Sequence, residues 1–88
     1  MPRYIIERTV GRLSSVELTA AGRRSVATLA GMPEVKWIRS YVSDLEGKIY
    51  CEYDAPSVDA ILEHARRAGL PVDRVSEVTM EISPAMFM

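Results

Sequence analysis

Residues 37–53, WIRSYVSDLEGKIYCEY, decide the fold because they have the pattern of a β-hairpin. In the turn DLEG, Asp44 occupies the first position and Gly47 the last, which suits a type I turn. An antiparallel ladder closed on this turn pairs the flanking residues outward, one pair at a time. The expected pairs are Val42 with Ile49, Tyr41 with Tyr50, Ser40 with Cys51, Arg39 with Glu52 and Ile38 with Tyr53.

The two faces of this hairpin differ in character, because side chains alternate between faces along a strand. The face expected to join the core is apolar and carries Ile38, Val42, Ile49, Cys51 and Tyr53. The other face is aromatic and charged and carries Trp37, Arg39, Tyr41, Tyr50 and Glu52. A face of the second kind is typical of a pocket wall or a subunit contact. Its candidate pocket residues are Trp37, Arg39, Tyr41 and Tyr50.

Two helices are predicted outside the hairpin. Ser14 and Glu17 form a capping box at the start of the first, and Gly31 ends it. Ser57 is the N-cap of the second, which ends at Gly69. The expected buried stripe of the first helix is Leu18, Ala21, Gly22, Ser25, Val26 and Leu29, and that of the second is Val58, Ile61, Leu62, Ala65 and Ala68.

Two further strands complete the set. Residues 3–10 are rich in β-branched and aromatic side chains, and residues 74–82 alternate in polarity. If Val78 faces the helices together with Met80 and Ile82, then Glu77 faces outward beside Glu7.

The order β-α-β-β-α-β predicts an α+β, ferredoxin-like fold. Both helices should then cover one face of a four-stranded antiparallel sheet. We expect a single domain over residues 1–83, followed at 84–88 by an apolar tail that could contact a second copy.

Composition narrows the classes of partner. The chain has 88 residues, 48% hydrophobic and 26% charged, with a net charge of −1, so we expect neither a nucleic acid nor a membrane as partner. Cys51 is the single cysteine, which excludes an internal disulfide, and the expected location is cytoplasmic. The aromatic face and the Met-Phe-Met tail favour a homodimer, with room for a small molecule in the interface.

Candidate metal ligands are few. His64 is the only histidine, and Cys51 lies on the strand that precedes its helix. Glu7, Glu52 and Glu77 could converge on the open face of the sheet, and a mixed nitrogen and oxygen site suits a divalent ion such as nickel. The alternative is structural: a hydrogen-bonded packing histidine, a small core thiol and solvated carboxylates.

An ordered set of short motifs runs along nearly the whole chain. It consists of Tyr4-x-Ile6-Glu7-Arg8, Trp37-x-x-Ser40-Tyr41-Val42, Lys48-x-Tyr50-Cys51-x-Tyr53-x-Ala55-Pro56, His64-Ala65-x-x-x-Gly69-x-Pro71 and Ser76-Glu77-Val78. With this set the chain resembles a family of small bacterial proteins that includes an actinobacterial nickel-binding protein. The resemblance implies a ferredoxin-like homodimer and nickel binding. It does not establish an enzyme activity, and no organic cofactor is indicated. The matching positions with suitable chemistry are His64, Glu7, Glu77, Cys51 and Tyr41.

Two other functions are kept beside nickel binding. One is a cofactor-independent enzyme similar to the dimeric α/β-barrel monooxygenases and isomerases. In it the aromatic face would line the pocket, Arg39 would hold an anionic substrate, and Glu7 or His64 would move protons. The other is a structural or regulatory interaction module that uses the same face as its contact surface.

Overall fold

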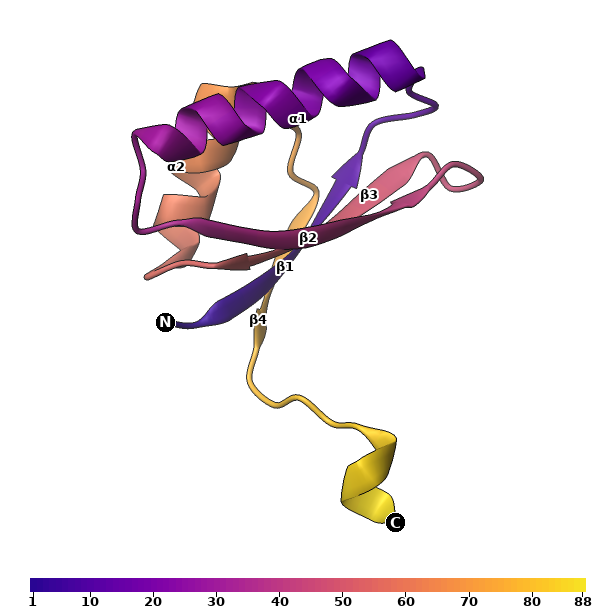
Figure 1. Ribbon diagram of the computed structural model, residues 1–88, viewed down its shortest axis with the longest axis vertical. Coiled ribbons are helices and arrows are strands. Elements are labelled where there is room, and N and C mark those ends of the chain that lie inside the picture. The colour runs from indigo at the N-terminus through magenta and orange to yellow at the C-terminus, as the bar shows by residue number, and fades with distance from the viewer.

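The computed structural model describes residues 1–88 and has the predicted order of elements. The elements are β1 (Arg3–Thr9), α1 (Ser15–Ala30), β2 (Lys36–Ser43), β3 (Lys48–Asp54), α2 (Val58–Ala68), β4 (Arg74–Val78) and a 3-10 helix, η1 (Pro84–Phe87). The antiparallel strands lie in the order β2-β3-β1-β4. Both α-helices lie on one side of this sheet (Figure 1). The ferredoxin-like α+β fold is thus confirmed.

Both predicted helix starts are present. The Ser14 hydroxyl accepts a hydrogen bond from the Glu17 N–H (3.1 Å), and the Glu17 carboxylate accepts one from the Ser14 N–H (3.0 Å). The bond from the Ser14 N–H and, after it, the nearby Ser14 hydroxyl lower the pKa of the Glu17 carboxyl group. Ser57 caps α2 through the Ala60 N–H, and Gly69 ends it with a left-handed φ of 67° that suits a residue without Cβ.

The hairpin keeps its predicted register except at its open end. The Gly47 N–H donates to the Asp44 carbonyl, as the turn requires. Beyond the Arg39–Glu52 pair the register shifts, so that Trp37 rather than Ile38 lies opposite Tyr53. The prediction that Ile38 pairs with Tyr53 is therefore wrong.

This irregularity moves Trp37 to the side of the sheet that faces the helices. There its ring lies over that of Tyr53, with centroids 6.5 Å apart and planes at 21°. Its Nε1–H donates to the Ser40 hydroxyl (2.8 Å). The placement of Trp37 on the open face is corrected for the same reason: the bulge shifts the alternation, and the ring packs on Tyr53 while the residue stays 37% exposed.

The faces of β4 are also opposite to the prediction. Tyr4 lies opposite Glu77 and Ile6 opposite Val75, so Val75 and Glu77 are on the helix-covered side and Val78 is on the open side. The strand ends at Val78 instead of Ile82, because Val78 already pairs with the first residue of β1. Residues 79–83 have no strand to pair with.

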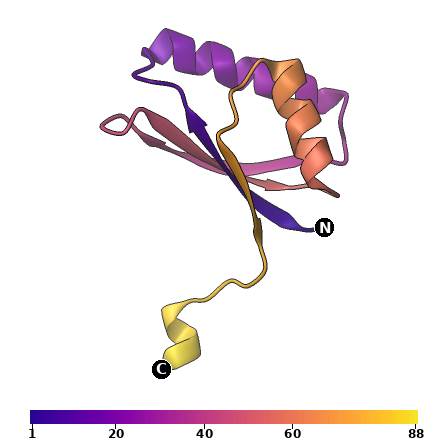
Figure 2. The same ribbon diagram turned by 180° about the vertical axis from the view of Figure 1, so that it is seen from behind.

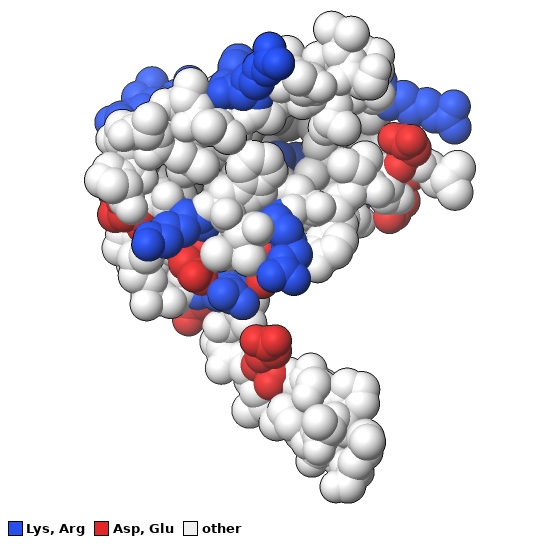
Figure 3. All heavy atoms as spheres, in the orientation of Figure 1, with Lys and Arg blue, Asp and Glu red and all other residues white.

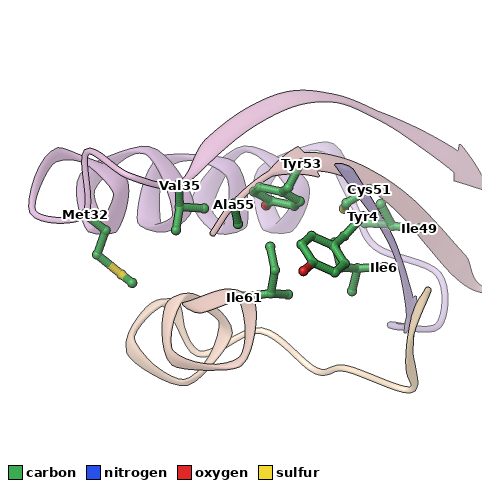
Figure 4. Close-up of a cluster of buried hydrophobic side chains, with 9 residues drawn as sticks. All are labelled: Tyr4, Ile6, Met32, Val35, Ile49, Cys51, Tyr53, Ala55 and Ile61. Carbon is green, nitrogen blue, oxygen red and sulfur yellow. The ribbon is translucent and has the colours of Figure 1, made fainter. Parts of the chain in front are cut away.

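The core lies between the sheet and the helices (Figure 4). Its buried residues are Tyr4, Ile6, Met32, Val35, Ile49, Cys51, Tyr53, Ala55 and Ile61. Helix α2 buries Ile61, His64, Ala65 and Ala68, whereas Val58 and Leu62 of its predicted stripe are exposed. Helix α1 fully buries only Ser25, and Val26 of its predicted stripe is 58% exposed. Helix α1 therefore covers the sheet much less tightly than α2 does.

Residues 79–88 form an arm that leads away from the domain (Figures 1 and 2). Its large apolar side chains are all exposed: Met80, Ile82, Met86, Phe87 and Met88. No helix in the chain combines the length and the apolarity needed to cross a membrane.

Candidate functional site

A cavity of about 290 Å³ lies between α1 and the helix-covered side of the sheet. Where α1 borders it, the helix carries Leu18, Ala21, Gly22 and Ser25, three of them small. Such short side chains leave the space over β2 and β3 unfilled. Figure 3 shows the molecule hollowed at this place, with Lys or Arg atoms visible inside the hollow.

The lining is apolar apart from one charge. Ten of the 14 lining residues are hydrophobic, and Arg8 is the only charged one. Trp37 and Tyr53 contribute aromatic rings, and Leu13, Val42 and Ile49 contribute aliphatic side chains. A mainly apolar pocket with few polar groups is typical of small-molecule sites.

Arg8 is buried without a counter-ion. The residue is 1% exposed, its Nε–H points to the Cys51 sulfur (3.4 Å) and its Nη1 donates to the Pro71 carbonyl (2.8 Å). Its guanidinium carbon lies 5.9 Å from the centre of the Tyr53 ring. It takes part in no ion pair, and Nη2 has no hydrogen-bond partner. An uncompensated buried charge costs several kcal/mol, roughly, even after the protein has relaxed around it.

His64 lies beside this charge and is fully buried. Its Nε2 shares a hydrogen bond with the Ser25 hydroxyl of α1 (3.2 Å), its ring centre is 5.3 Å from that of Tyr53, and its Nδ1 has no partner. Burial and, after it, the charge of Arg8 lower the pKa of His64. The imidazole is therefore neutral at pH 7. Arg8 is the only charge in the buried cluster that it forms with Ser25, Tyr53 and His64.

Tyr53, whose ring lies next to Arg8, is neutral as well. Burial raises the pKa of the Tyr53 hydroxyl, while Ser25 and then Arg8 partly oppose that rise, so this group also stays neutral. No carboxylate lines the cavity. A general base of the kind expected for the enzyme hypothesis, a carboxylate with a raised pKa, is thus not part of its wall.

The predicted pocket face is divided by the structure. Trp37 lines the cavity, whereas Arg39, Tyr41 and Tyr50 lie on the open face with Glu52. Arg39 is 3.7 Å from Glu52, whose carboxylate also binds Arg3 (3.1 Å). The Tyr50 hydroxyl contacts Glu46, and burial followed by that carboxylate raises its pKa.

The candidate metal ligands do not lie close together in the structure. Cys51 and His64 lie on the helix-covered side, Glu77 lies on the same side at the edge opposite Tyr4, and Glu7 and Tyr41 lie on the open face. No three His, Cys, Asp or Glu side chains come close enough to hold an ion.

The inner pair, Cys51 and His64, fits a divalent cation poorly. The Arg8 guanidinium contacts the Cys51 sulfur and, after burial, is the second cause of the lowered pKa of His64, so it would repel an added positive charge. On the open face Glu7 is partly neutralised by Lys48 at 3.9 Å. The residues of a single chain therefore do not fit a nickel centre.

The importance of Arg8 was missed from the sequence, although a signal was present. Residues alternate along β1, and once Glu7 is placed on the open face its neighbour Arg8 must point inward, in line with Tyr4 and Ile6. An arginine in an otherwise apolar row was the mark of this site.

Comparisons with known proteins agree with the fold and give a family. The crystal structure of SCO4226 from Streptomyces coelicolor A3(2) superposes with a TM-score of 0.80 at 22% identity, over 91% of this chain and 99% of that chain. No curated protein matches the sequence. The family described as "Nickel responsive protein SCO4226-like" matches residues 4–78. The chain therefore belongs to the SCO4226-like family.

Proposed function

We propose that this protein responds to nickel by binding the ion between two copies of the chain. The observation that carries the proposal is the match of residues 4–78 to a family described as nickel responsive. A homodimer presents each donor twice around its two-fold axis, so ligands that are too few in one chain become sufficient in a pair. Carboxylate oxygens with water then complete a site for a divalent ion.

Glu7 is the first candidate ligand. It lies at the centre of the open face, on β1, between β3 and β4, where a second copy can approach it. Its ion pair with Lys48 is long, at 3.9 Å, and Lys48 can be displaced. Tyr41 and Glu77 are also accessible, whereas Cys51 and His64 are buried beside the Arg8 charge.

The arm, residues 79–88, supports association between copies. Phe87 is 74% exposed and Met80 75% exposed, and neither has apolar contacts within its own domain to remove it from water. Apolar segments of this kind in small proteins usually pack on a partner. We propose that the partner is a second copy.

Native mass spectrometry with and without Ni²⁺ tests this proposal. The wild-type chain should appear as a dimer that takes up nickel in a fixed ratio to the dimer. Glu7→Gln should lose the nickel and keep the dimer, whereas Glu34→Gln, at an exposed site that takes part in no ion pair, should behave as the wild type. Uptake that is unchanged in Glu7→Gln but lost in His64→Gln would place the ion in the buried layer and refute this assignment.

A matched pair of variants tests the arm. Phe87→Asp should shift the protein toward monomer, and Leu45→Asp at the hairpin turn, where the leucine is 93% exposed, should not. Equal dimer fractions in the two variants would count against a role of the arm in assembly.

A further inference from the structure

The charge of Arg8 is not balanced by any group of its own chain. Arg8 is 1% exposed, no acidic side chain pairs with it, and its Nη2 has no hydrogen-bond partner within the chain. Buried guanidinium groups in stable proteins are normally paired and fully hydrogen-bonded. The same residue lines a cavity, so a group that enters the cavity meets the Arg8 side chain.

The cavity defines the charge of that group. One cation and no carboxylate line the wall, and His64 beside Arg8 is neutral. A monoanion balances this charge. A phosphate with two charges would leave one unbalanced among apolar side chains, and a metal cation would add to the charge of Arg8. A planar carboxylate also matches the fork of a guanidinium better than a spherical anion does.

The cavity also limits the size and shape of the ligand that carries this charge. Its volume of about 290 Å³ is small for a ligand site, and its walls are mainly aliphatic and aromatic. Trp37 and Tyr53 place two rings along it, which favours a flat apolar body.

We propose that the cavity between α1 and the sheet binds a small organic monocarboxylate, with its carboxylate on Arg8 and its apolar body between α1 and the rings of Trp37 and Tyr53. The site is independent of nickel and lies on the opposite side of the sheet from Glu7. It would give the protein a second, organic ligand.

The chain contains its own reporter. Trp37 is the only tryptophan and lines the cavity, so its fluorescence should change when a ligand enters. Full-length protein is titrated with benzoate, and with benzamide as the neutral analogue of nearly the same shape. Phenyl phosphate and inorganic phosphate serve as anions of higher charge. All solutions contain EDTA, so that a failure here has no bearing on nickel binding.

Benzoate should change the Trp37 emission in a saturable way. Benzamide should bind about tenfold more weakly or worse, because it lacks the charge that satisfies Arg8. Both phosphates should be weaker than benzoate. Equal affinity for benzoate and benzamide, or no saturable change with benzoate, would overturn the proposal.

Two variants locate the binding. Arg8→Met removes the charge, keeps a long side chain and should abolish the preference for benzoate over benzamide. Gly22→Leu leaves Arg8 intact and fills the cavity, because a Cβ at Gly22 would have nothing within 4 Å. It should lose benzoate binding, while Gly22→Ala keeps it. Wild-type benzoate affinity in Gly22→Leu would show that benzoate binds elsewhere and would refute the site.

Discussion

The two faces of the sheet use arginine in opposite ways. On the open face Arg3 contacts both Glu52 and Asp54 at 3.1 Å, and Arg39 contacts the same Glu52. On the helix-covered face Arg8 is buried with a sulfur, a carbonyl and an aromatic ring as neighbours and with no carboxylate. Two of these arginines, Arg3 and Arg8, lie on the same strand.

This difference separates charges that are already paired from one that would gain a partner if an anion bound. Ion pairs at the solvent-exposed surface contribute little to stability, because water can replace either partner. Little binding free energy can therefore be gained by giving such charges a new partner. A charge buried without a partner lowers the stability of the empty protein, and binding an anion can recover that loss. The unpaired guanidinium, and not the network of ion pairs, is therefore where a ligand gains most.

The largest contrast between the faces should come from two tyrosines of β3. Tyr53 is 1% exposed and packs against Trp37 and His64, so Tyr53→Ala should cost about 3–5 kcal/mol of unfolding free energy. Tyr50 on the open face contacts Glu46 through its hydroxyl, and Tyr50→Ala should cost about 1 kcal/mol or less. Urea denaturation of both variants measures the contrast. Similar costs would mean that the contact with a second copy proposed around Glu7 extends over Tyr50 and packs it as firmly as Tyr53.

Acid should weaken the helix-covered face through His64. Burial and the charge of Arg8 put the folded-state pKa of His64 below its unfolded value of about 6.5. Because the unfolded chain takes up this proton first, the contribution of His64 to stability is complete above about pH 6.5 and is lost as the pH falls through the folded-state pKa.

Melting temperatures recorded from pH 8 down to about pH 5 test this prediction, since that range spans the unfolded histidine value. His64→Gln should make the dependence on pH shallower in the lower half of the range. An identical profile in His64→Gln would assign the acid sensitivity to the carboxylates of the open face.

The ion-pair network of the open face should matter less, and salt should weaken it further. Glu52 contacts both Arg3 and Arg39, and Glu52→Gln should cost about 1 kcal/mol at low salt. Most of that cost should disappear in 1 M NaCl, where the screening length is about 3 Å. A cost that is unaffected by salt would indicate that the network is shielded from water.

The smallest effect is expected at the cavity wall. Gly22 is in the middle of α1 with open space beside it, so Gly22→Ala should stabilise the protein by about 0.5–1 kcal/mol. Gly11, with a φ of 69°, provides the contrasting position, where alanine should destabilise. A destabilising Gly22→Ala would mean that α1 lies closer to the sheet than the cavity requires.

Sequence patterns were sufficient for the fold because each element carried its own signal. The Asp44–Gly47 turn set the hairpin register from Arg39 to Val42, and the Ser14 capping box set the start of α1. It was harder to predict from the sequence which side chains of β2 and β4 face the helices. A single irregularity at Ile38 reverses the side on which Trp37 lies, and nothing local in the sequence marks it.

The site could be predicted only in part, because it depends on how elements meet. Cys51 and His64 were singled out because Cys51 lies on the strand before the helix of His64, but the bonds of Cys51 to Arg8 and of His64 to Ser25 join residues far apart in the chain. Alternation along β1 would have placed Arg8 inside, had it been followed beyond Glu7. The sequence could not show that Arg8 has no carboxylate near it, because this depends on all the residues that line the cavity.

The most direct test of this account is the unfolding free energy of the wild type and of Arg8→Met, each measured with and without benzoate. Without benzoate, Arg8→Met should be at least as stable as the wild type, because removal of a desolvated charge outweighs the lost hydrogen bond to Pro71. Benzoate should then stabilise the wild type alone. A less stable Arg8→Met together with no effect of benzoate on the wild type would show that Arg8 serves only the fold.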